Sequence, residues 1–204
     1  MKRLALLLAV LCCLMAACSA KPSNVEPLPC AMDLNNLGNC TISGSLKQGD
    51  AYVDDTGAMQ MKITVFFYDE YNKEHIDQLK VKDFITIRGQ RVSVAALERN
   101  QYGAVHINGG MDGDGYTLFT DGKVYFEVGF NDAKCWQELG TATIRVSQDL
   151  IFTDRSNPDL GTVTYYPGDF LIPNGGIEYN FNPYNTVFSI QGGLLTAIDR
   201  FYIP

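Results

Sequence analysis

Acidic residues and glycines are interspersed in "GGMDGDGYTLFTDGK", residues 109–123, a composition typical of loops that bind calcium through carboxylate oxygens. On the EF-hand loop template, Asp112 and Asp114 occupy the third and fifth positions. Gly110 falls on the first position, which requires an oxygen ligand, and the flanking sequences alternate like strands, not helices. The stretch is therefore predicted to form turns without a tight metal site. A weak calcium site formed by Asn108, Asp112 and Asp114 is the alternative.

Paired carboxylates are a second candidate chemistry, because glycosidases place two acids on either side of the bond that they cleave. Acids available for such a pair are Asp54-Asp55, Asp69-Glu70, Asp112/Asp114 and Asp132. Adjacent acids in an extended segment point to opposite faces, and 23 acidic residues produce some pairs by chance. Solvated surface charge is the favoured interpretation. A secreted hydrolase is the alternative function, and no catalytic residue is assigned.

Cysteines and histidines give little support for nucleophilic or zinc chemistry. The chain has no G-x-S-x-G motif and no C-x-x-C spacing, and its two histidines, His75 and His106, lie far apart. Cys135, beside Trp136, is interpreted as a small buried apolar side chain. No cofactor is expected.

Aromatic residues offer a binding interpretation, since the chain holds 11 Tyr and 11 Phe and many fall within residues 164–188. Ile177, Tyr179 and Phe181 alternate with polar residues, which predicts a strand that faces the core. Three tyrosines lie instead beside proline or glycine, where loops expose side chains. These candidates for binding a protein or carbohydrate ligand are Tyr165, Tyr166 and Tyr184.

The N-terminus has the features of an export signal. After two basic residues, residues 4–17 form an apolar run too short to span a membrane. The run ends in "LMAACS", which resembles the bacterial lipobox, with Met15 in place of the usual Leu. The resemblance implies removal of residues 1–17 and attachment of diacylglycerol to Cys18, which would hold the protein on the extracytoplasmic face of the membrane. Cleavage after Ala20, which would release a soluble protein, is the alternative.

Residues 18–40 are predicted to be a lipid-anchored spacer, because "SAKPSNVEPLP" is rich in proline and small polar residues. Cys30 and Cys40 flank a polar turn at its end. An oxidising exterior would permit a disulfide between them, and two free thiols are the alternative.

The charge of the chain limits its partners. The formal net charge is −7, and removal of the two positive charges in residues 1–17 makes it −9. An acidic domain without a basic patch is a poor partner for nucleic acid. Diacylglycerol supplies two acyl chains, which suffice for stable membrane anchoring.

Period-two alternation dominates from residue 41 onward and predicts strands. The clearest examples are "MQMKITVFFY", "TLFTDGKVYFEVGF" and "TATIRVS". Two-residue hairpin turns are predicted at Gly89-Gln90, Asp121-Gly122 and Gly192-Gly193. Helical spacing is limited to "DEYNKEHIDQL" and, more briefly, "VAALERN".

These patterns predict a single mainly β-domain over residues 41–204, an antiparallel barrel or sandwich with one or two short helices. The segments "DGKVYFEVGFND" and "GGLLTAIDRFYIP" resemble uncharacterised exported proteins of gut Gram-positive bacteria, a resemblance that implies no activity and no functional residue. Together with the lipobox, the sequence predicts a non-catalytic, lipid-anchored interaction or envelope module.

Overall fold

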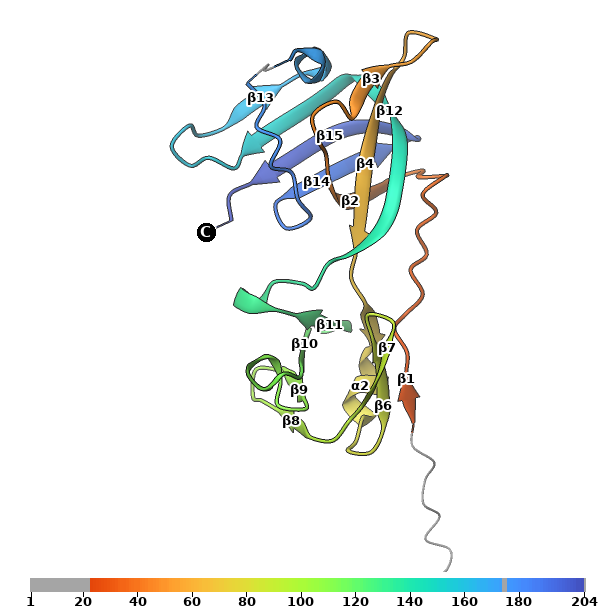
Figure 1. The fold of residues 1–204 in the computed structure, drawn as a ribbon, viewed down its shortest axis with the longest axis vertical. Coiled ribbons are helices and arrows are strands. Elements are labelled where there is room, and N and C mark those ends of the chain that lie inside the picture. Colours follow the sequence, from red (N-terminus) through yellow and green to blue (C-terminus); the bar gives the residue numbers. More distant parts are fainter. Residues whose placement is uncertain (1–22, 174–175, 204) are drawn as a thin grey trace, which may run out of the picture.

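The computed structural model describes residues 23–173 and 176–203 of the 204-residue chain. The expected signal peptide and Cys18 lie outside the described residues. The fold consists of a barrel and a smaller β-rich unit, which occupy the upper and lower parts of Figure 1.

Five strands close the barrel in a ring, each hydrogen-bonded to the next. In ring order they are β2 (Cys40–Ser45), β4 (Met59–Phe67), β12 (Gln137–Arg155), β15 (Leu194–Phe201) and β14 (Thr186–Gln191). Four of the five pairings are antiparallel, and β12 pairs with β15 in parallel. The short strands β3 (Ala51–Val53) and β13 (Val163–Tyr165) extend the sheet beside β4 and β12. OB-folds are likewise five-stranded Greek-key barrels.

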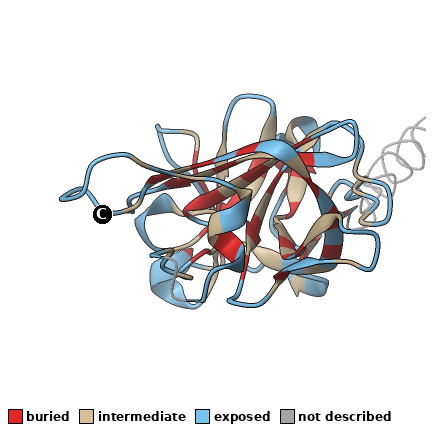
Figure 2. Ribbon diagram, turned by 90° about the horizontal axis from the view of Figure 1, so that it is seen from above, coloured by how far each residue is buried: buried red, intermediate tan, exposed pale blue. Residues whose placement is uncertain are grey.

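Alternating apolar residues fill the barrel. On β4, Met61, Ile63 and Val65 are fully buried, and Lys62 between them is exposed. Figure 2 shows the buried stretches along the strands, with exposed loops around them. Side chains from every strand of the ring therefore share one hydrophobic cluster.

A buried ion pair joins two neighbouring strands of the barrel. Arg200 on β15 is 1% exposed, and its Nε donates to Asp154 Oδ1 of β12 at 3.0 Å. A second guanidinium nitrogen donates to the other Asp154 oxygen. The guanidinium also lies 4.5 Å from the ring centroid of Phe181 and 5.2 Å from that of Phe152. Paired on one side and covered by rings on the other, the charge is held away from water.

The lower unit is inserted between β4 and β12. It contains two small sheets, one of β6 and β7, which β1 (Asn24–Val25) joins from the N-terminal part of the chain, and one ordered β5-β11-β10-β9-β8, with one α-helix among the described residues. Its elements are β5 (Glu70–Asn72), α2 (Lys73–Gln78), β6 (Phe84–Ile87), β7 (Gln90–Ser93), β8 (Leu97–Arg99), β9 (Val105–Ile107), η1 (Met111–Gly113), β10 (Tyr116–Thr120), β11 (Val124–Val128) and η2 (Phe130–Asp132). A second hydrophobic cluster, including Tyr71, Ile76 and Ile107, forms its core.

The two ends of the insertion lie together. Phe67, the last residue of β4, pairs with Gln137, the first residue of β12. The chain therefore leaves the barrel and returns to it at neighbouring positions.

Residues 23–39, here called the N-terminal strap, contact both units. Strand β1 (Asn24–Val25) pairs in parallel with β6 of the lower unit, and Leu28 N donates to Glu70 O at 2.6 Å. Further along, Met32, Leu34 and Leu37 pack against the barrel core. The described part of the expected spacer, from residue 23 onward, is thus packed against the fold.

The mainly β fold class expected from the sequence is confirmed, as a barrel. The helix expected in "DEYNKEHIDQL" is present as α2, where Asn72 Oδ1 accepts from the amides of Glu74 and His75. The prediction of a short helix in "VAALERN" is wrong. Leu97–Arg99 pairs with β9 as strand β8, and the Asn108 side chain binds the amides of Ala95 and Ala96 just before it.

The segment containing Ile177, Tyr179 and Phe181 is not a strand. The expected alternation is nevertheless present, because these side chains pack against the barrel core and Glu178 and Asn180 are exposed. An apolar alternation thus marks the buried side of an extended segment even where no neighbouring strand pairs with it.

Candidate functional site

A cleft of about 670 Å³ lies where the strap, the barrel and the lower unit meet. We call it the junction cleft. Its walls are residues 28–32 of the strap, 41–43 of β2, Phe66 and Phe67 of β4, and Tyr68, Glu70, Lys134 and Trp136. Residues distant in the sequence are therefore gathered at the joint between the two units.

Strand pairing at the joint brings two aromatic rings together. Tyr68 follows β4 directly and Trp136 precedes β12 directly, so the pairing of Phe67 with Gln137 makes them neighbours. Their ring centroids are 4.9 Å apart and the planes cross at 84°, an edge-to-face contact. Phe126 of β11 makes a similar contact with Tyr68 at 5.8 Å. Tyr68 and Trp136 are each only partly buried, which leaves aromatic surface facing the cleft.

A cation lies against these rings. The Lys134 ammonium is 3.9 Å from the ring centroid of Tyr68 and 4.7 Å from that of Phe126, and it donates to Tyr68 Oη at 2.5 Å. An ammonium has three donors, so it retains the capacity to bind a ligand oxygen. On the other walls, Thr41 and Ser43 contribute hydroxyl groups and Glu70 a carboxylate. The junction cleft thus combines aromatic faces with separate hydrogen-bonding groups.

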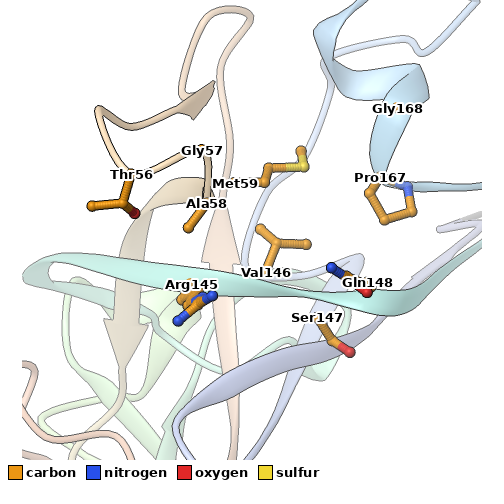
Figure 3. Close-up of a pocket in the computed structure, with 10 residues that line it drawn as sticks. All are labelled: Thr56, Gly57, Ala58, Met59, Arg145, Val146, Ser147, Gln148, Pro167 and Gly168. Carbon is orange, nitrogen blue, oxygen red and sulfur yellow. The ribbon is translucent and has the colours of Figure 1, made fainter.

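A second cleft, of about 430 Å³, borders the other end of β4 (Figure 3). It is formed by the turn of residues 56–59, residues 145–148 of β12, and the start of η3 (Pro167–Leu171). Asp54 shapes this turn, because its Oδ1 accepts from the amides of Thr56 and Ala58. Arg145 is the only charged residue in the lining, and no aromatic ring lines it. The second cleft therefore offers fewer means of recognition than the junction cleft.

The acids considered for catalysis are dispersed. Hydrogen bonds from the Thr56 hydroxyl, the Gln60 amide and the Ala58 backbone hold the pKa of Asp54 well below its usual value, so it is a turn-forming carboxylate. Its neighbour Asp55 is exposed. Asp69 is buried and accepts from Arg88 N at 2.8 Å, whereas Glu70 lines the junction cleft. The two carboxylates of Asp54-Asp55, like those of Asp69-Glu70, therefore do not share a site.

Asp114 and Glu127 both line a shallow cleft of about 280 Å³. Glu127 is engaged there, because both of its oxygens accept from the Arg88 guanidinium. Asp112 and Asp132 are exposed and do not line this cleft.

Of the three residues considered for calcium, Asn108 is already engaged within the fold. Asn108 Oδ1 accepts from the amides of Ala95 and Ala96, so it is used in holding a neighbouring turn. Asp112 and Asp114 are exposed at η1, which lies between strands β9 and β10 and not between helices. In the part of the chain that the structure describes, no three His, Cys, Asp or Glu side chains are grouped as metal ligands.

The cysteines described by the structure are free thiols, so the disulfide expected between Cys30 and Cys40 is not present. The physical reason for the absence of this disulfide is the path of the strap. Between the two cysteines, Leu34 and Leu37 extend over the barrel core, so the segment is not the compact turn that the spacing suggested. Burial raises the pKa of Cys135, which disfavours the thiolate that a nucleophile requires.

The tyrosines proposed as ligand contacts are not gathered at one site. Tyr165 stacks on Phe152 at 5.2 Å and donates to Gly176 O, which makes it part of the barrel packing. Tyr166 and Tyr184 are exposed but line neither of the two larger clefts. Reasoning from the sequence missed Tyr68, Lys134 and Trp136, and the only available signal was Trp136, the single tryptophan of the chain.

Among the described residues, no helix has the length and apolar character needed to cross a bilayer. The chain matches no protein-family model, no curated protein and no solved structure.

Proposed function

We propose that the protein is a lipid-anchored, extracytoplasmic β-protein that binds a ligand without catalysing its conversion, and that the junction cleft is the ligand site. The observation that carries the proposal is the convergence of Tyr68, Lys134 and Trp136 in one open cleft. The anchor is inferred from the lipobox resemblance at Cys18. Dispersal of the acids favours a binding role over hydrolysis.

The composition of the junction cleft suits a carbohydrate. A sugar ring has an apolar face that stacks on an aromatic side chain, and hydroxyls that need polar partners at its rim. Trp136 and Tyr68 provide the first, and Thr41, Ser43 and Lys134 the second. OB-folds bind oligosaccharides and oligonucleotides on their second and third strands. In this barrel the second and third strands are β4, which lines the cleft through Phe66 and Phe67, and β12, which begins directly after Trp136.

Ligand binding can be tested through Trp136, which as the single tryptophan reports on the cleft. Titration with N-acetylglucosamine oligomers and with neutral hexose oligomers should produce a saturable change in its emission for at least one of them. Tyr68→Ala should weaken that binding about tenfold, the effect of losing one stacked ring at roughly 1.4 kcal/mol. Tyr184→Ala, an exposed tyrosine outside the junction cleft, is the matched control.

Two results would contradict the proposed ligand class. One is the absence of any saturable change with either glycan series. The other is a change produced only by peptides, which would make the cleft a protein-binding site. Release of reducing ends from a glycan, abolished by Glu127→Gln, would favour the hydrolase alternative.

The anchor is tested separately, by mass spectrometry of the mature N-terminal peptide and by cell fractionation. We expect diacylglycerol on Cys18, and Cys18→Ala should move the protein out of the membrane fraction or leave it as uncleaved precursor. Cleavage after Ala20, with no lipid, would refute the anchor.

A further inference from the structure

The start of the described chain is fixed at one end of the lower unit. Phe84 N donates to Ser23 O at 2.8 Å, and Ser23 N donates to Asp83 Oδ1 at 2.9 Å. The other Asp83 oxygen accepts from Lys80 N at 2.9 Å. Asp83 therefore ties Ser23 to the turn formed by residues 80–83. In Figure 1, β1 lies in the part of the molecule remote from the barrel.

Only five peptide units separate Ser23 from Cys18. Five residues reach at most about 18 Å even when fully extended. Because lipid on Cys18 would lie in the bilayer, the turn beside Ser23 must stay within that distance of the membrane surface. This step rests on the anchor given above as part of the proposed function.

The turn exposes two cationic side chains on either side of an apolar one. Lys80, Val81 and Lys82 are all exposed, Val81 to 49%. Neither lysine takes part in any of the four ion pairs found among the described residues. Lys82 has a φ of 80°, and its amide donates to Val94 O, so hydrogen bonding at both ends of the turn holds it in shape. An acidic protein is otherwise repelled by an anionic membrane, and a lysine near the surface counters that repulsion.

We propose that the Lys80–Val81–Lys82 turn docks on anionic phospholipid, with the ammonium groups at the headgroups and Val81 at the interface. The lipid anchor and this turn then form two attachments a short distance apart. They orient the molecule with the lower unit at the membrane and the barrel away from it.

Fluorescence quenching of the lipidated protein in phosphatidylglycerol vesicles with brominated acyl chains tests the proposal. In a Trp136→Phe background, the only tryptophan is the one introduced by Val81→Trp or by Leu160→Trp, the second at an exposed barrel position. We expect quenching for Val81→Trp and none for Leu160→Trp. Lys80→Glu with Lys82→Glu should disfavour docking by more than tenfold and abolish the quenching. Lys47→Glu with Lys62→Glu, exposed lysines of the barrel, should leave it unchanged.

Mass spectrometry of the same samples separates the two ways of failing. If lipid is confirmed on Cys18, three results would overturn the docking surface and leave the anchor intact. These are equal quenching at both positions, no quenching at position 81, and no effect of the lysine reversals. Absence of lipid on Cys18 would refute the anchor, and the docking surface with it.

Discussion

Removal of the Arg200 side-chain charge would leave Asp154 as an unpaired carboxylate inside the barrel. Arg200→Met keeps most of the buried volume but removes both hydrogen bonds to that carboxylate. We expect a loss of about 3–5 kcal/mol in the free energy of unfolding, measured by urea denaturation.

The matched control is Arg155→Met. Arg155 pairs with Asp199 at 3.1 Å, but both side chains are substantially exposed, so this loss should be about 1 kcal/mol or less. The double variant with Arg200→Met and Asp154→Leu should recover part of the stability, because it removes both buried charges. Equal losses for Arg200→Met and Arg155→Met would show that the buried pair contributes no more than a surface pair.

Acid should weaken the barrel through the same carboxylate. Burial alone would raise the pKa of Asp154, but hydrogen bonds from Arg200 and from the Ser156 amide outweigh it and hold the pKa below its usual value. A lowered folded-state pKa stabilises the protein above the unfolded value of about 3.9. That stability is lost as the pH falls through the folded-state pKa.

Thermal unfolding between pH 6 and pH 2 measures this effect. The melting temperature of the wild type should fall more steeply below about pH 4 than that of the Arg200→Met, Asp154→Leu double variant. Parallel curves for the two proteins would exclude Asp154 as a source of the acid sensitivity.

At the residue scale, the sequence contained a signal for the buried pair in its alternation, whereas for the junction cleft it offered only the single tryptophan, Trp136. Asp154 shares the core-facing alternation of Phe152, and Arg200 that of Ile198, so opposite charges stand at core positions of two strands. Tyr68 and Trp136 carry no such signal, because they become neighbours only through the pairing of β4 with β12.

The turn sequences predicted the positions of the hairpins more accurately than the geometry of their turns. At Gly192-Gly193 both φ angles are positive and Gln191 pairs with Leu194, as expected of a two-residue turn. The first hairpin turns at Arg88-Gly89, one residue earlier than predicted, because Ile87 pairs with Gln90.

The two-residue turn predicted at Asp121-Gly122 is wrong, because Thr120 pairs with Tyr125 and the loop is wider than two residues. Asp121 Oδ1 accepts from the amides of Lys123 and Val124, which closes this wider loop. The side-chain bonds of a turn residue thus decided its width, which a dipeptide rule does not consider.

Among the glycines of residues 109–115, Gly115 has the least space around it. A Cβ at this position would lie 2.0 Å from the carbonyl oxygen of Ile107 and 2.5 Å from that of Asn108. Gly115→Ala should therefore separate β9 from β10 at their junction and cost about 3 kcal/mol in the free energy of unfolding. Gly168→Ala, where a Cβ would meet nothing within 4 Å, is the control and should be nearly neutral. A well-tolerated Gly115→Ala would mean that the loop can shift to make room.

The residues that the structure describes form two hydrophobic clusters, and hydrogen exchange can show whether these unfold together. Ile107→Ala removes buried volume from the lower unit and Ile63→Ala from the barrel, each at about 2–5 kcal/mol. We expect Ile107→Ala to speed amide exchange in β9 and β10 while β14 and β15 stay protected, and Ile63→Ala to do the reverse. Loss of protection throughout the chain in both variants would show one cooperative unit instead of two.

No boundary between these units could be recognised in the sequence, and the fold explains why. A boundary is usually recognised by a linker rich in proline, glycine or polar residues. Here the insertion begins at Tyr68 and ends at Trp136, both packed at the joint, with no such linker on either side.

The pairing of Phe67 with Gln137 has a consequence for how the chain folds. Strands β4 and β12 are separated by the whole insertion, and closing so long a loop is entropically unfavourable and slow. Contacts within the lower unit are more local, so that unit can form first and hold Phe67 and Gln137 together. The barrel strands would then pair progressively, starting from Phe67 and Gln137, which are already held together. The insertion would thus act as a built-in folding nucleus for the barrel that surrounds it in the sequence.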